Sequence, residues 1–419
     1  MKTSQKNLTA SDYVSEQRLW DLLMDVANYG ATKKGGVNRQ ALSPEDTAAK
    51  NHVVRWANER GFSSFHDEIG NLFIRREGND PELDPVMTGS HLDSQPTGGR
   101  FDGAFGVLAG LEALEALNDS GIHTKRPVEV VAWTNEEGSR FSPGAMGSSV
   151  FSGVRDLHSV MDLTDPAGVA LSDALKVTLS EVSAKLSSLG RVKPYSYVEA
   201  HIEQGPILEE GGIPIGVVSG IQGIRHIDIN VTGEEAHAGT TPLRARTDAL
   251  VGGIKIVNAL HNLTFDEKDI LRFTIGRFEV HPGSPNTVPG QVHFTIDLRH
   301  PDKNILNSVG DEIHTVAKNA AEDYDVEVLD IGSITPTNFE PKMINIIAKA
   351  ANNLNFANIT MPSGAGHDAM HLSNICPTGM IFVPCLGGVS HNEAESASSQ
   401  DLAIGTKVLV DSITQLANE

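Results

Sequence analysis

The spacing of apolar residues along the first part of the chain predicts two helices at its start. Four apolar residues between positions 19 and 26 fall on one face of a helix. A second helix is expected from Pro44 to about Arg60, because Ser43 is a favourable N-cap and proline suits the first helical position. Gly61 is then placed to end that helix.

Apolar runs that are too short for helices follow, and they predict the strands of a buried sheet. These runs cover residues 71–75, 85–88, 127–134 and 195–201. A helical pattern from Val107 to Leu117 separates the second run from the third. Strands that alternate with helices are typical of a mainly parallel sheet with helices on both faces. In such sheets ligands bind beyond the carboxyl ends of the strands.

The pattern changes after residue 212, where alternating segments predict a half-exposed antiparallel sheet. Four strands are expected, at residues 213–218, 225–232, 271–280 and 291–298. Two helices accompany them, one from Pro242 to about Leu260 with Thr241 as its cap, and one over residues 302–321. The apolar stripe of the first helix is assigned to Leu250, Ile254 and Val257.

The remaining segments complete the first domain, so the second domain is predicted to be an insertion. They are a helix over 341–354, a strand over 380–384 and a C-terminal helix from Ser399. The expected fold class is α/β, with a catalytic domain formed by residues 1–212 and 331–419. Residues 213–330 form a smaller α+β domain with four antiparallel strands and two helices. Residues 146–193 give only a confused helical pattern, and no role is assigned to them.

Composition narrows the range of partners. The 419 residues carry a formal net charge of −21, which disfavours binding to nucleic acid or to an anionic membrane. No run of about 18 apolar residues occurs and the N-terminus lacks an apolar signal segment, so we expect neither a membrane span nor a signal peptide. The two cysteines, Cys376 and Cys385, form no recognisable metal or disulfide pattern. A cytoplasmic location is therefore expected.

The glycine-rich segment from Gly89 to Gly106 is the first candidate functional site. It follows a predicted strand and contains His91, Asp93 and Asp102. One imidazole and two carboxylates at the end of a strand are suitable metal ligands. The alternative is a polar loop in which aspartates stabilise turns and glycines adopt positive φ.

Three further groups share this placement at the end of a strand. Glu136 and Glu137 follow one strand, His201 ends another, and His391 follows a third. Each of these residues, taken singly, is more often a solvated charge or a hydrogen-bonded structural residue. A hydrolytic site with two metal ions requires nitrogen and oxygen ligands, one bridging carboxylate, and one free carboxylate that acts as a base.

The motifs in which these residues lie resemble those of the hydantoinase/carbamoylase family of amidases. They are, in chain order, GSHLDSQPTGGRFDGAFGVLAG, WTNEEGSRF, EAHIEQGPILE, EAHAGTTP, PNTVPG, DLRHPD, SGAGHDA and FVPCLGGVSHNEAE. The match extends over about residues 15 to 415. This family is a branch of the dinuclear zinc-peptidase superfamily.

The resemblance implies a role for each residue of the first domain. One ion would be held by His91, Asp102 and His201, and the other by Asp102, Glu137 and His391. Glu136 would be the general base. Asp93 would orient His91, since imidazole ligands need such a partner. The ions would be zinc or manganese, with cobalt or nickel as further possibilities.

The resemblance also gives the inserted domain a role in dimerisation and in catalysis. His237 would reach the active site of the partner subunit in a homodimer. Substrate contacts would come from Gln204, Asn286, Arg299, Gly364, Gly366 and His367. Arginine suits the substrate carboxylate because its guanidinium can form two parallel hydrogen bonds. The chain departs from many relatives at His226, where an aromatic residue is expected.

The implied reaction is hydrolysis of the carbamoyl C–N bond of a small ureido compound. N-carbamoyl-L-amino acids and N-carbamoyl-β-alanine are the expected substrates. Allantoate amidohydrolase is the first alternative, and a dipeptidase or aminoacylase on the same scaffold is the second. A binding protein that has lost its metals is a further alternative, which the complete set of five ligands disfavours.

Overall fold

The computed structural model describes residues 8–187 and 193–419. Residues 188–192, which end the segment without an assigned role, and residues 1–7 of the N-terminus lie outside this description. The chain divides into two compact units. The first contains Met1–Ser219 and Phe339–Glu419, and the second contains Gly220–Asn338.

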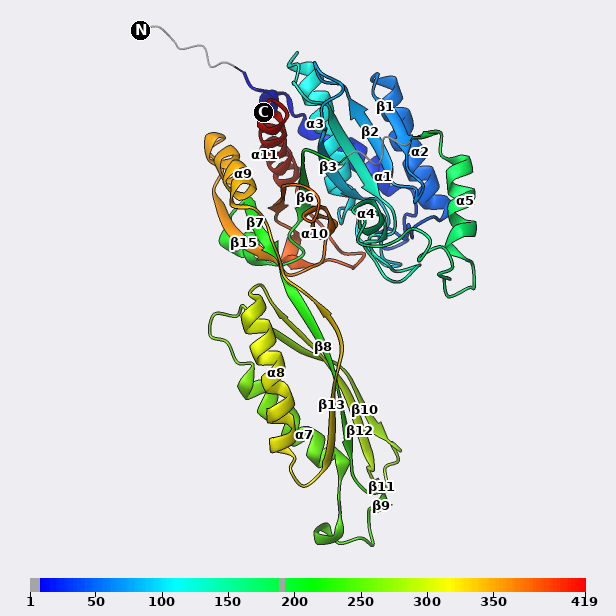
Figure 1. Ribbon diagram of the computed structural model, residues 1–419, viewed down its shortest axis with the longest axis vertical. Helices are drawn as coiled ribbons and strands as arrows, with labels where there is room; N and C mark the ends of the chain where they lie inside the picture. Colours follow the sequence, from blue (N-terminus) through cyan, green and yellow to red (C-terminus); the bar gives the residue numbers. More distant parts are fainter. Residues whose placement is uncertain (1–7, 188–192) are drawn as a thin grey trace. The chain divides into compact units, whose positions relative to one another are not determined.

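The first unit is built on one large sheet, to which residues 220–221 and 337–338 at the two boundaries of the second unit also belong (Figure 1). Within the described residues, its strands are β1 (Ser63–His66), β2 (Leu72–Arg76), β3 (Val86–His91), β4 (Val128–Trp133), β5 (Lys185–Leu186), β6 (Ser196–Ile202), β7 (Ile215–Ile221), β14 (Thr337–Asn338), β15 (Asn358–Ser363) and β16 (Thr378–Val383). Their order is β14-β7-β16-β6-β3-β4-β2-β1-β5, and β15 also pairs with β7. The four central strands β16, β6, β3 and β4 run parallel, which confirms the predicted fold class.

Helices accompany this sheet along the chain. They are α1 (Glu16–Ala27), α2 (Pro44–Glu59), α3 (Ala104–Asp119), α4 (Met146–Phe151), α5 (Leu171–Glu181), α6 (Ile207–Gly211), α9 (Pro341–Asn353), α10 (Ala369–Leu372) and α11 (Ser399–Ala417). The start of α2 is as predicted, since the Ser43 hydroxyl accepts a hydrogen bond from the Asp46 amide.

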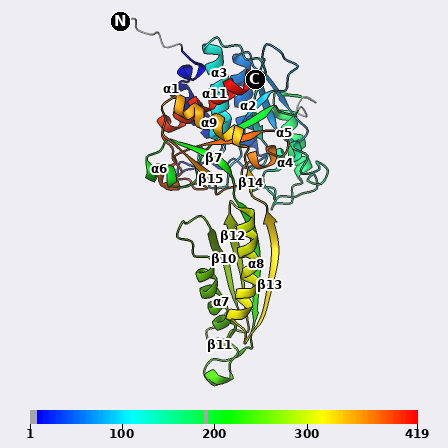
Figure 2. The same ribbon diagram turned by 60° about the vertical axis from the view of Figure 1, so that its left-hand side comes forward.

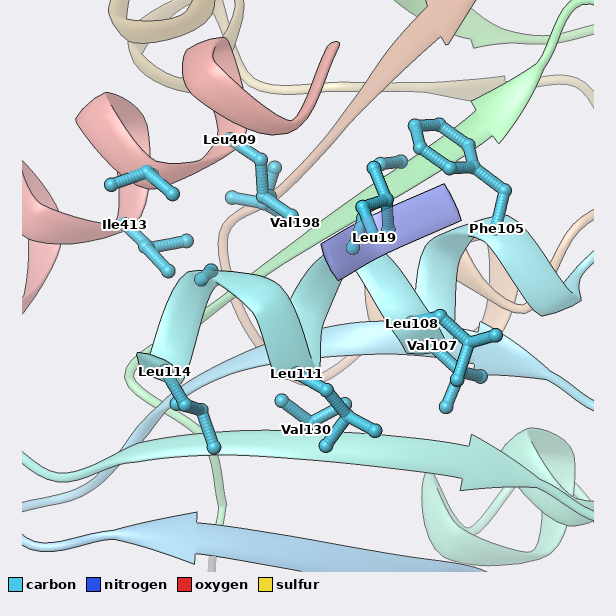
Figure 3. Close-up of a cluster of buried hydrophobic side chains, with 14 of the residues drawn as sticks. Leu19, Phe105, Val107, Leu108, Leu111, Leu114, Val130, Val198, Leu409 and Ile413 are labelled. Carbon is cyan, nitrogen blue, oxygen red and sulfur yellow. The ribbon is translucent and has the colours of Figure 1, made fainter. Parts of the chain in front are cut away.

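Alternate residues of the central strands pack against different layers, as the two-residue period of a strand requires. On one face, Val130 and Val198 pack with Leu108 and Leu111 of α3, and α11 adds Leu409 (Figure 3). The alternate residues of β4 include Trp133, whose ring contacts other aromatic rings from β2, α4 and β6: Phe73, Phe151 and Tyr197. Both faces of the central sheet are therefore buried.

The second unit is an antiparallel sheet with two helices on one face (Figure 1, Figure 2). Its strands, in the order β10-β12-β8-β13, are β8 (Gly223–Thr232), β10 (Arg272–His281), β12 (Gln291–His300) and β13 (Asp325–Ile334). The helices are α7 (Ala249–Leu263) and α8 (Lys303–Ala320), and a small ladder joins β9 (Ala236–His237) to β11 (Thr287–Val288). Ile227, Ile229 and Val231 of β8 pack in the core with residues of α7 and α8.

The structure corrects the strand assignment in this region. The segment predicted as the first strand of the small sheet is β7, which pairs antiparallel with β16 in the large sheet. It is buried almost throughout, because neighbours cover both of its faces. The fourth strand of the small sheet is β13, and β15 also escaped prediction.

The predicted start of the long helix is also wrong. Residues 243–245 form a short 3-10 turn, and α7 begins only after Asp248, whose carboxylate accepts hydrogen bonds from the Leu250 and Val251 amides. Ile254, which was assigned to the buried stripe, is 49% exposed. The small residues Gly252 and Gly253 lie on the buried face instead. The spacing of the apolar residues alone therefore predicted the buried face of this helix incorrectly.

Candidate active site

The predicted ligands of the first unit come together at the carboxyl ends of adjacent parallel strands. His91 is the last residue of β3, and Glu136 and Glu137 follow β4. His201 lies at the end of β6, and His391 follows β16. Because β4, β3, β6 and β16 are neighbours in the sheet, residues 300 positions apart in the chain reach the same place.

Asp102 joins these residues into one site, because its two carboxylate oxygens face different groups. Its Oδ1 atom lies 3.2 Å from Nε2 of His201 and 3.8 Å from Nε2 of His91. Its Oδ2 atom lies 3.4 Å from Nε2 of His391, which is itself 3.3 Å from Oε2 of Glu137. Asp102 is thus the shared member of two three-residue groups.

The separations between these atoms are those of ligands around a cation. Four donors placed about 2.1 Å from a tetrahedral ion lie about 3.4 Å from one another. The atom pairs around Asp102 span 3.2–3.8 Å, and the donors are imidazole nitrogens and carboxylate oxygens, which suit divalent transition metals. The site is therefore positioned to hold a metal.

The charges around the site also favour the binding of cations. Burial, and next the charge of Asp368, raise the pKa of Glu136 well above its usual range. Burial and the charge of Asp102 do the same for the pKa of Glu137. Burial lowers the pKa of His91 to about 4, so its ring is neutral near pH 7, as a metal ligand must be. Several buried carboxylates are costly unless cations or protons compensate their charge.

A glycine lets the Asp102 loop fold over His91. Gly103 has a φ of +64°, and a Cβ atom at this position would lie 2.3 Å from the His91 ring. Only glycine tolerates both the left-handed backbone and the close ring. The loop can therefore bring Asp102 back to the metal-binding side of His91.

Asp93 acts differently from the expectation. Its main-chain carbonyl, rather than its carboxylate, accepts the hydrogen bond from Nδ1 of His91, at 2.8 Å. The Asp93 carboxylate lies 3.9 Å from that nitrogen and instead accepts hydrogen bonds from the amides of Glu136 and Glu137, both at 3.2 Å. It thus fixes the main chain of the two glutamates.

Further hydrogen bonds fix the main chain of the loop after β4. The Gly147 amide donates to the carbonyl of Thr134 and the Ala145 amide to that of Glu136, at 2.8 and 2.7 Å. Asn71, fully buried, accepts from the Thr134 amide at 2.9 Å and donates to the Gly147 carbonyl at 3.1 Å. These contacts leave the Glu136 side chain with Oε2 at 3.5 Å from Nε2 of His91.

Gln204 and His367 contact two of the predicted ligands, Asp102 and His201, in the structure. Gln204 was expected to contact substrate, and its Nε2 donates to Oδ2 of Asp102 at 2.9 Å. His367 is 2% exposed, and its ring stands edge-on to that of His201 with 4.5 Å between centroids. Gly364 and Gly366 lie on the exposed loop just before His367.

The other predicted substrate contacts lie in the second unit. His237 is exposed, and its Nδ1 accepts hydrogen bonds from the Gly239 and Thr240 amides at 3.0 and 3.1 Å. The neutral ring then carries its proton on Nε2. Asn286 is joined to this segment by the Ala238 amide, which donates to the Asn286 carbonyl at 3.0 Å.

Arg299 forms hydrogen bonds with a carboxylate of its own strand. Its Nε and Nη2 atoms donate to the two carboxylate oxygens of Asp297 at 2.7 and 2.9 Å. Nε2 of His226 lies 3.0 Å from the same carboxylate. The residue that departs from many relatives therefore belongs to the polar group around Arg299.

Sequence reasoning missed two buried glutamates beside the ligands. Glu199 lies two residues before His201 and accepts hydrogen bonds from the Ser90 hydroxyl at 2.7 Å and the Ala369 amide at 2.9 Å. Glu395 lies four residues after His391, and its pKa is raised to about 7 by burial and by the charge of Asp102. Both lie in motifs that carry the family resemblance. Their short separation in the sequence from a histidine predicted to bind metal is the signal that could have identified them.

The fold and the site of this chain are those of a metal-dependent hydrolase. The family model described as "Peptidase family M20/M25/M40" matches residues 87–415. The chain is 40% identical over 410 residues to the N-carbamoyl-L-amino-acid amidohydrolase of Rhizobium meliloti, which covers 96% of this chain and 97% of that protein. It is 34% identical to the ureidoglycolate hydrolase of Oryza sativa subsp. japonica, covering 97% of this chain and 85% of that protein.

Solved structures agree with the sequence relatives. An amidase of the hydantoinase/carbamoylase family from Burkholderia multivorans superposes with a TM-score of 0.92 at 42% identity, covering 97% of this chain and 98% of that chain. The chain belongs to peptidase family M20/M25/M40 and, within it, to the hydantoinase/carbamoylase amidases. This confirms the resemblance seen in the motifs. In the described part of the chain, no helix combines the length and apolarity needed to cross a membrane.

The protonation of His201 predicts a pH-dependent metal affinity. Burial alone would lower the pKa of His201, but the hydrogen bond and charge of Asp102 outweigh it and raise the pKa to about 9. Below that pH a cation must displace a proton, so affinity should rise about tenfold per pH unit between pH 6.5 and 8.5. Calorimetric titration of metal-free protein with Zn²⁺ or Mn²⁺, in two buffers of different ionisation enthalpy, would measure affinity and proton release. An affinity independent of pH would contradict this assignment.

Proposed function

We propose that the protein hydrolyses the carbamoyl C–N bond of N-carbamoyl-L-amino acids, with two divalent metal ions, zinc or manganese, in each subunit. The observation that carries this proposal is the division of Asp102 between two ligand groups beside the Glu136 carboxylate. The relatives named above, which act on ureido compounds according to their names, support the substrate class. The cytoplasmic location stays a prediction.

The residues of the site suit this hydrolysis. Two divalent ions held there would polarise the ureido group and ease ionisation of the attacking water, whose pKa can fall to about 7. Glu136 takes the proton from that water and later delivers it to the leaving nitrogen. The products are the amino acid, ammonia and carbon dioxide.

The second unit would complete the site in the homodimer. The Nε2 proton of His237 can donate a hydrogen bond to the oxygen that becomes negative during the attack. Asn286, joined to the same segment, and Arg299 would bind the substrate carboxylate. For Arg299 this requires that the substrate replace or share the contacts with Asp297, which offers the same carboxylate geometry.

A substrate panel tests the proposed activity directly. N-carbamoyl-L-amino acids should be hydrolysed with a kcat/KM at least about tenfold above that for N-carbamoyl-β-alanine, allantoate, ureidoglycolate, a dipeptide and N-carbamoyl-D-amino acids, since a pocket that fits one shape loses 1–3 kcal/mol on another. Chelators should abolish the activity, and added metal should restore it. Preference for allantoate would replace the proposal with its first alternative, and preference for ureidoglycolate would replace it with the activity for which the rice relative is named.

Substitution of the proposed base separates catalysis from metal binding. Glu136→Gln should lower kcat about 100-fold or more, which is the usual size of a general-base effect, and leave the metal content unchanged. Metal content by mass spectrometry and steady-state kinetics would measure the two effects. Glu181→Gln, an exposed position at the end of α5, is the matched control and should behave as wild type. Near-normal turnover by Glu136→Gln would remove this residue from the mechanism.

Complementation tests whether His237 acts across the dimer. His237→Ala and Glu136→Gln subunits should each be nearly inactive. After subunit exchange about half of the dimers are mixed and each has one intact site, so activity should return to about a quarter of wild type. Rates measured before and after exchange would decide this. Absence of recovery in dimers shown to be mixed would mean that His237 serves its own chain.

A further inference from the structure

Two loops that are distant in the sequence must meet before the site is complete. Asp102 comes from the glycine-rich loop after β3, and His391 comes from the loop after β16. The ligand His391 is 52% exposed at its side chain and has a left-handed backbone, with φ of +53°. Burial of the ring therefore cannot be what holds it opposite Asp102.

Glu395 connects these two loops. It is 2% exposed, and its Oε1 atom accepts hydrogen bonds from the amides of Phe101 and Asp102 at 2.9 and 3.1 Å. A Cβ atom on Gly99 would lie 2.1 Å from this carboxylate. The glycine-rich loop is thus shaped around the Glu395 side chain, which fixes the main chain of the bridging residue itself.

The other oxygen of Glu395 reaches the neighbour of the ligand His391. Oε2 accepts a hydrogen bond from the Ser390 hydroxyl at 3.0 Å. The same hydroxyl lies 3.0 Å from Oδ2 of Asp102, and Nε2 of Gln204 donates to it at 3.2 Å. One carboxylate therefore contacts the main chain of one metal ligand and the residue adjacent to the other.

We propose that Glu395 is a positioning residue that sets the bridging geometry of Asp102 relative to His391. This inference rests on the proposed function only in that Asp102 and His391 hold a cation. Glu395 is not a metal ligand, because both of its oxygens accept hydrogen bonds from donors of the protein. It acts through the amides of residues 101 and 102 and through Ser390.

Substitutions of Glu395 can distinguish an effect of its hydrogen bonds from an effect of its negative charge. In Glu395→Gln the amide oxygen can accept from the same two main-chain amides, and the amide nitrogen can donate to Ser390 Oγ, which then donates to Asp102. In Glu395→Ala both links are lost. If Glu395 acts by position, the glutamine variant should bind metal nearly as the wild type does.

Metal affinity of the metal-free proteins is the measurement that tests this. Calorimetric titration with Zn²⁺ or Mn²⁺ should show Glu395→Ala weakened about 10- to 100-fold at one of the two sites, the usual cost of losing a residue that orients a ligand. Glu395→Gln should stay within about threefold of wild type. Glu393→Gln, two residues earlier in the same loop and paired with Lys34 at 3.5 Å, is the matched control and should not change the affinity.

The other outcomes are equally decisive. Wild-type affinity in Glu395→Ala would overturn the proposal, and a loss in Glu395→Gln as large as in Glu395→Ala would assign the effect to charge instead of position. If Glu395→Ala does not fold by circular dichroism, Ser390→Ala replaces it: a weakened site supports the proposal and an unchanged one overturns it. A wild-type protein that binds metal but hydrolyses no ureido compound would refute the proposed function and leave this inference intact.

Discussion

The site depends on one carboxylate that is shared by two groups of candidate metal ligands. Asp102 is buried, and each of its oxygens lies within 4 Å of different imidazoles. Around it the fold gathers further buried carboxylates, which would repel one another in a medium of low polarity without compensating charge. The surroundings are arranged to hold this unfavourable group in place: main-chain amides donate to Asp93 and Glu395, and a glycine makes room for the ring of His91.

The parallel sheet makes this gathering possible. Strands β4, β3, β6 and β16 lie side by side although they are distant in the chain, and their carboxyl ends share one edge. Buried aromatic residues link these strands: the Tyr197 hydroxyl donates to the Gly89 carbonyl at 2.9 Å and accepts from Nε1 of Trp133 at 3.1 Å. The packing of the sheet thus sets where His91 and His201 lie, and the loops that follow the strands bring Asp102, Glu137 and His391 to the same edge.

The second unit contributes a different kind of chemistry. It has its own apolar core, and its candidate substrate-binding residues are exposed (His237 and Asn286) or half-buried (Arg299). The β9/β11 ladder brings His237 next to Asn286, and the pairing of β8 with β12 places His226 opposite Asp297. Under the proposed function, His237 and Asn286 would offer hydrogen-bond donors to an anionic substrate, in contrast to the acidic site of the first unit.

The sequence by itself determined the fold class, the family and the identity of the candidate ligands, because apolar periods, helix caps and spaced motifs are local properties. It placed His91, Glu137 and His201 at strand ends, as the structure does. It failed where the decision depends on distant neighbours: β7 reads as a half-exposed strand but is covered on both faces, and the face of α7 is set by glycines that pack closely. Only the tertiary structure could reveal that Asp93 holds the glutamate amides and that Glu395 reaches Asp102 across 293 positions. Hydrogen bonds between residues so far apart leave no periodic signal in a single sequence, since their geometry arises only when the sheet has formed.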